Sequence, residues 1–171
     1  MRWLRSLRPL RAERTWRASL SRTTFRRDPS APVPVPLPTP RELVDVLGVG
    51  RTEIVEGRAL TLLSLERYRE SDVVTFRIAR MREGRTFASP ELRIAFEPAP
   101  ESEPRVWSMG GSGGGSDELV WRISYAIAPP TPRGSAFTVV VTAIEWHAHE
   151  GGQRRIESVE PGAWRFAIIP P

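Results

Sequence analysis

The stretch Leu119–Ile127, with the sequence LVWRISYAI, decides the fold class because large apolar residues recur at every second position. These apolar positions are Leu119, Trp121, Ile123, Tyr125 and Ile127. Successive side chains of a β-strand point to opposite faces of a sheet, whereas an amphipathic helix repeats at every third or fourth residue. The pattern therefore predicts a strand with one buried and one exposed face.

The same alternation recurs before and after this stretch, in residues 74–78, 92–96 and 164–168. Residues 60–68 also have the composition of a strand, but their apolar phase changes at Leu62–Leu63, where we expect a β-bulge. Residues 137–146 are apolar on both faces, which is typical of a central strand.

Residues 43–47 and 52–55 add two short opening strands, which brings the expected total to about eight. No window of the domain keeps a helical period, so the βαβ folds that host most nucleotide chemistry are disfavoured. We therefore predict an all-β domain over residues 43–171, built as an antiparallel two-sheet sandwich.

Two segments of different composition precede this domain. Residues 1–27 contain nine arginines and one glutamate, and blocks of like charge favour a disordered tail. Three further interpretations stay open for this tail: an arm that binds nucleic acid or an anionic surface, a targeting segment, or a wrongly extended gene start. Residues 28–42 contain alternating prolines, which predict an extended, semi-rigid linker.

The composition excludes several classes of chemistry. All 25 basic residues are arginines, and the chain contains no lysine, cysteine or asparagine. Disulfides, thiolate nucleophiles and lysine-based catalysis are therefore impossible. Proteins of thermophiles commonly contain little asparagine, glutamine and cysteine, so the composition is typical of a thermophile. The use of arginine in place of lysine is also what a GC-rich genome produces.

One strand end carries a candidate metal site. Glu145, His147 and His149 lie at positions i, i+2 and i+4, so on a strand they would share one face. Two imidazoles and a carboxylate form a plausible set of ligands for a divalent metal ion. The alternative is that all three side chains face water beside a hairpin at Gly151–Gly152.

Residues 107–115 contain two further candidates. Trp107 lies between a proline-rich loop and a glycine-rich stretch, so we expect it to be an exposed partner-binding residue. Residues 110–114 satisfy the G-x-S-x-G pattern of a nucleophile elbow, with Ser112 at its centre. No helix is predicted after this serine, and we interpret the stretch as a flexible linker between strands.

The segments GRALTLLSLERYRESDVVTFRI, ELRIAF, WRISYAIAPPTPRGSAFTVVVTAIEW and PGAWRFAII resemble bacterial immunoglobulin-like domains of unknown function. The resemblance covers residues 43–169 and concerns strand pattern and the placement of aromatic residues. It implies a sandwich with Trp121, Trp146 and Trp164 near the core, and it implies no enzymatic activity.

The sequence therefore predicts a non-enzymatic module, without cofactor, that binds another protein or serves a structural role. Two alternatives are a nucleic-acid- or anionic-surface-binding protein that uses residues 1–27, and a metal-binding protein centred on Glu145, His147 and His149. No signal peptide or transmembrane segment is recognisable, which predicts a cytoplasmic protein, or an envelope-associated one if translation starts elsewhere.

Overall fold

The structure is a computed structural model that describes residues 37–81, 88–99, 104–115, 118–131, 133–150 and 153–169. The predictions for the tail, residues 1–27, and for most of the linker, residues 28–42, lie outside the described residues. Among the residues that are described, no helix is long and apolar enough to cross a membrane.

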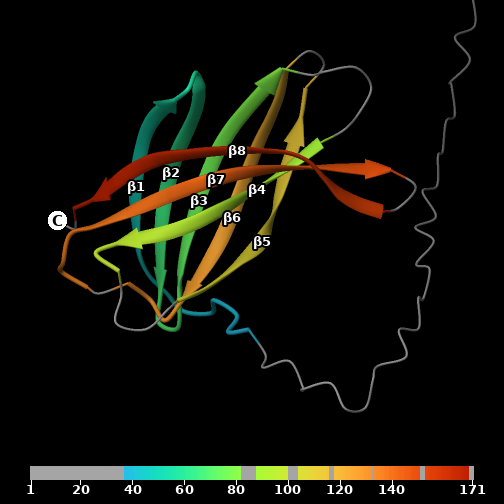
Figure 1. The fold of residues 1–171 in the computed structure, drawn as a ribbon. Helices are drawn as coiled ribbons and strands as arrows, with labels where there is room; N and C mark the ends of the chain where they lie inside the picture. Colours follow the sequence, from blue (N-terminus) through green and yellow to red (C-terminus); the bar gives the residue numbers. More distant parts are fainter. Residues whose placement is uncertain are drawn as a thin grey trace, which may run out of the picture. The chain divides into compact units, whose positions relative to one another are not determined.

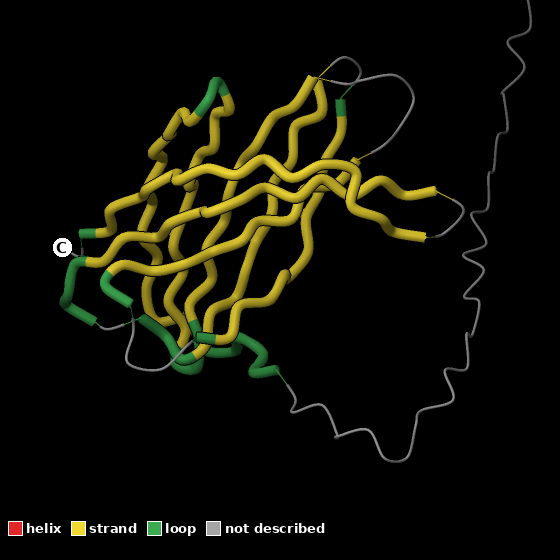
Figure 2. Tube along the Cα trace, in the orientation of Figure 1, coloured by secondary structure: helices red, strands yellow, loops and turns green. Residues whose placement is uncertain are grey.

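The described part of the chain forms eight strands in two antiparallel sheets (Figures 1 and 2). The larger sheet has the order β1-β2-β3-β6-β5, and the smaller sheet has the order β4-β7-β8. Figure 1 shows the smaller sheet lying across one face of the larger one. The predicted all-β, two-sheet antiparallel fold is therefore confirmed. The strands are β1 (Leu43–Val55), β2 (Arg58–Tyr68), β3 (Asp72–Met81), β4 (Ala88–Glu97), β5 (Arg105–Gly114), β6 (Glu118–Ala128), β7 (Phe137–Glu150) and β8 (Gln153–Ile168).

Two expectations about individual strands are wrong. The two short opening strands are one continuous strand, β1, whose pairing with β2 shifts register between Gly48 and Arg51. The glycine-rich stretch that was expected to be a linker lies within strand β5, which pairs with β6 from Arg105 to Gly114. Glycine is a poor strand former on propensity grounds, and pairing with the long strand β6 overrides that preference here.

The core lies between the sheets and consists of the apolar side chains that the alternation predicts. Trp121, Trp146 and Trp164 are all buried, and Phe76 of the larger sheet meets Phe166 of the smaller sheet edge to face. The expected bulge is confirmed, because the register between β2 and β3 shifts between Leu62 and Ser64. Both Leu62 and Leu65 are consequently buried although they are three residues apart.

A half-buried polar clamp joins the two sheets at one side of this core. Arg58 of β2 donates two hydrogen bonds to the Glu160 carboxylate of β8, at 2.8 and 2.9 Å, and a third to the Ala79 carbonyl. The Trp146 indole donates to the same carboxylate at 2.8 Å. The guanidinium groups of Arg58 and Arg80 also lie 5.7 and 4.8 Å from the Trp146 ring centroid, within cation–π distance.

A second polar contact crosses the core itself. The buried Tyr125 hydroxyl of β6 accepts a hydrogen bond from the Leu92 amide of β4 at 2.7 Å. Since β4 is an edge strand, this bond satisfies an amide that would otherwise be buried without a partner. Burial raises the pKa of Tyr125 to about 12.

The clamp predicts a large cost for replacing Glu160. In Glu160→Ala, Arg58 and the Trp146 indole both lose their shared acceptor, and we expect the free energy of unfolding to fall by about 2 kcal/mol. Glu97→Ala is the control, since it removes an exposed ion pair with Arg165 and should cost less than about 1 kcal/mol. Urea denaturation of both variants checks this, and equal losses would contradict the clamp.

Tyr125→Phe tests the contact across the core. Leaving the Leu92 amide unpaired should lower the free energy of unfolding by about 1–3 kcal/mol at neutral pH. Burial makes the folded protein favour the neutral phenol of Tyr125. The stability that Tyr125 contributes is therefore complete below its unfolded pKa of about 10 and is lost as the pH rises toward its folded pKa of about 12. Denaturation between pH 8 and 12 should show the difference between the two proteins shrinking, and a difference independent of pH would contradict the assignment.

Candidate functional site

The outer face of the smaller sheet carries the polar side chains that the core excludes. In β7, Ile144 and Trp146 point into the core, so Glu145 and His147 point outward between the neighbouring strands. The register places Glu91 of β4 opposite Glu145, and Ile156 of β8 opposite His147. Although this face is turned away from the core, both Glu145 and His147 are buried.

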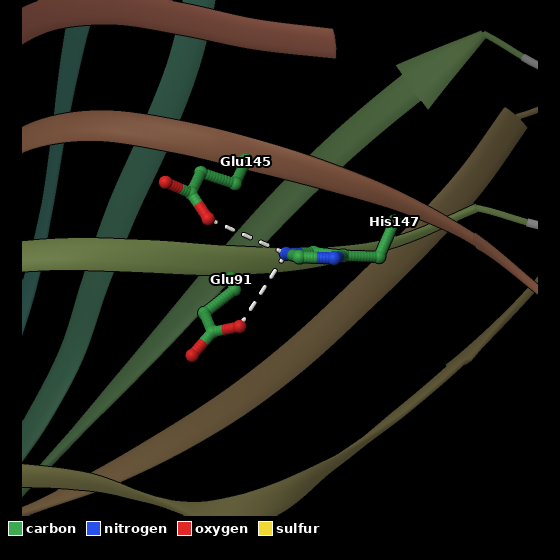
Figure 3. Close-up of side chains that lie close together, drawn as sticks. All are labelled: Glu91, Glu145 and His147. Atoms are coloured by element: carbon green, nitrogen blue, oxygen red, sulfur yellow. Dashed lines mark ion pairs between the residues drawn. The ribbon is translucent and has the colours of Figure 1, made fainter. Parts of the chain in front are cut away.

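Glu91, Glu145 and His147 converge on one point (Figure 3). The His147 Nε2 atom lies 3.4 Å from Glu91 Oε2 and 3.5 Å from Glu145 Oε2. One ligand atom from each of the three residues falls within 4.8 Å of the other two. The group could therefore hold a metal ion between the two strands.

Two arginines hold the carboxylates from outside. Arg93 of β4 forms an ion pair with the Oε1 atom of Glu145. Arg154 of β8 forms an ion pair with the Oε2 atom of Glu91. These ion pairs fix the orientation of both carboxylates. The other oxygen of Glu145, Oε2, is not paired with Arg93 and faces His147.

His149 does not belong to this group. Its Nε2 atom lies 2.7 Å from the Ser89 hydroxyl oxygen, and its side chain is exposed. The sequence placed Glu145, His147 and His149 together because they share a strand face, and the structure brings together only the first two. Glu91 was missed because its place beside Glu145 depends on the pairing of β4 with β7, which residue spacing along one strand does not reveal.

Ser89 and His149 form a hydrogen-bonded pair of their own. Among the described residues, no carboxylate is hydrogen-bonded to the His149 ring, so the pair lacks the third group that orients a catalytic base. Ser112 lies in strand β5 of the other sheet, and among the described residues no helix follows it to present it as a nucleophile.

The outer face of the larger sheet presents a different surface. Trp107 is half-buried beside Ala126, its partner across β5 and β6. Further along the same face, Arg77 and Arg122 lie opposite each other on β3 and β6. Within the described part of the chain, neither of these exposed arginines has an acidic partner.

A shallow hollow of about 430 Å³ adjoins the two arginines, and glycines of β5 form one side of it. Gly113 stands opposite Trp121, and a Cβ atom there would lie 2.3 Å from the indole ring. The glycine thus lets the buried Trp121 ring pack against the backbone of the edge strand. The hollow is lined by Leu63, Arg77, Ser112, Gly113, Gly114, Val120, Trp121 and Arg122.

No family model, curated protein or solved structure matches this chain.

The packing of Trp121 on β5 predicts different outcomes at two adjacent glycines. Gly113→Ala places a methyl group inside the indole ring and should lower the free energy of unfolding by about 1–3 kcal/mol. Gly114→Ala is the matched control, because nothing lies within 4 Å of the added Cβ atom, and it should leave stability unchanged or raise it slightly. Chemical denaturation measures both, and equal effects would show that β5 does not pack as described.

Proposed function

We propose that this chain is a non-enzymatic, immunoglobulin-like module that binds a partner protein through the free edge of strand β5. The strand order supports the fold assignment. In a constant-type immunoglobulin domain, strands A-B-E-D form one sheet and C-F-G the other. When β1 is set aside as an additional strand, β2-β3-β6-β5 and β4-β7-β8 follow that order.

The observation that carries the binding proposal is the uncovered edge of β5. This strand ends the larger sheet, no other described strand pairs with its free side, and it is exposed from Ser108 to Gly114. An edge with unpaired backbone groups accepts an extended peptide as an added strand. Apart from Met109, this stretch contains only serine and glycine, which leave the backbone open to such a peptide.

The other three sheet edges are less suited to strand addition. β4 contains Pro90 and β8 contains Pro161, and proline removes a backbone donor. β1 has two register shifts, and Arg51 on it is hydrogen-bonded to the Ala167 carbonyl of β8. β5 has one register shift, between Ser108 and Gly110, but among the described contacts it has neither a proline nor a hydrogen bond to the smaller sheet.

Charge indicates which kind of segment would bind. Arg122 of β6, the strand next to β5, faces outward without an acidic partner among the described residues, so an acidic side chain of an added strand would meet it, and Arg77 lies one strand further from the edge. Residues 1–27, with nine arginines, have the wrong charge to fill this place. The proposed occupant is therefore an extended acidic segment of another protein, with Trp107 beside it as an apolar contact.

Selection of random phage-displayed peptides on the full chain tests the proposal. We expect acidic peptides with alternating side-chain character that slow amide hydrogen exchange between Ser108 and Gly114. Arg122→Glu should weaken their binding at least tenfold, since the charge that meets the acidic side chains is reversed. N-methylation of alternate peptide amides should abolish binding, because it removes the donors of the added strand.

Arg155→Glu is the matched control, because it makes the same charge change at an exposed arginine on the other sheet. Its affinity should stay within about twofold of the original chain. Selected peptides that bind Arg122→Glu as tightly as the original chain would refute the proposal. A dimer that pairs through β5 would likewise refute it, since a second copy would then be the occupant.

A further inference from the structure

We infer that Glu91, Glu145 and His147 form a binding site for a divalent transition-metal ion such as Zn²⁺. The site lies on the outer face of the smaller sheet, away from the β5 edge. It depends neither on a partner protein nor on the function proposed above.

The first observation is the state of His147. Its side chain is only 9% exposed, and its Nε2 atom has no hydrogen-bond partner although it points between the two carboxylates (Figure 3). Buried polar atoms without a partner are rare in folded proteins, because burial removes their hydrogen bonds to water. A metal ion at this point would give the nitrogen lone pair the partner that it lacks.

The second observation is the spacing. Zn²⁺ binds histidine nitrogen and carboxylate oxygen at about 2.0–2.2 Å, so two ligand atoms in a tetrahedral site lie about 3.3–3.6 Å apart. The distances from His147 Nε2 to Glu91 Oε2 and Glu145 Oε2 are 3.4 and 3.5 Å. These distances are too long for good hydrogen bonds and suit atoms that share a metal ion.

The surrounding charges indicate how the ion would be held. Arg93 and Arg154 form ion pairs with the two carboxylates. Metal ligands are commonly oriented in this way by residues that do not touch the ion themselves. The Oε2 atom of Glu145 is not paired with an arginine and would bind the ion. The Oε2 atom of Glu91 is paired with Arg154, so Glu91 would bind the ion through either of its carboxylate oxygens. Three protein ligands leave a fourth tetrahedral position for water or an external ligand.

The mixture of ligands selects the class of metal. An imidazole nitrogen with two carboxylates suits Zn²⁺ and its neighbours in the transition series, whereas Ca²⁺ and Mg²⁺ prefer oxygen ligands alone. The chain has only two histidines and no cysteine, so few other soft ligands compete for such an ion.

The test is titration calorimetry of the full chain, prepared without a histidine tag and treated with a chelator, against Zn²⁺ and then Mg²⁺. We expect one equivalent of Zn²⁺ to bind and Mg²⁺ not to bind. His147→Ala and Glu145→Gln should each weaken Zn²⁺ binding at least tenfold. Circular dichroism verifies that both variants fold, and Glu91→Gln, at a more exposed position, supplies a third variant with the same expected loss.

His149→Ala is the control that separates this site from adventitious binding. His149 lies on the same strand face but contacts Ser89, so its removal should change Zn²⁺ affinity by less than about twofold. An equal loss in His149→Ala and His147→Ala would overturn the assignment in favour of the two histidines acting together. Unchanged binding in folded His147→Ala, or no stoichiometric binding in the original chain, would overturn it outright.

Discussion

The hydrogen bond from the Trp146 indole to Glu160 fixes strand β7, and much of the molecule depends on the position of that strand. Arg58 binds the same carboxylate from the opposite sheet, so one acidic group ties three strands together. β7 is the central strand of the smaller sheet, and its side chains alternate between the core and the outer face. With Trp146 pointing inward, Glu145 and His147 point outward, on the face that carries Glu91.

This arrangement explains why a strand can carry both a core and a polar site. The inward positions of β7 bury large apolar side chains that stabilise the sandwich. Two of the outward positions, Glu145 and His147, are also buried, so these polar groups lose water without entering the core. In this environment, ion pairs and metal–ligand contacts are stronger than on an open surface.

The sequence predicted what depends on alternation along a single strand, and missed what depends on pairing between strands. The two-sheet fold, the three buried tryptophans and the bulge after Leu62 all follow from the spacing of apolar residues. Strand β5 was missed because its glycines give no side-chain pattern, although Gly113 has a definite role beneath Trp121. Glu91 was missed for a related reason, because only the register of β4 against β7 brings it to Glu145.

Among the described residues, the exposed arginines Arg77 and Arg122 and the buried His147 differ in what a missing partner costs the fold. Arg77 and Arg122 are exposed, so water solvates their charges and their lack of acidic partners costs the folded state little. His147 is buried, and its Nε2 atom has only the distant carboxylates of Glu91 and Glu145 beside it and makes no hydrogen bond. A metal ion between the two carboxylates would give this nitrogen the partner that burial otherwise denies it.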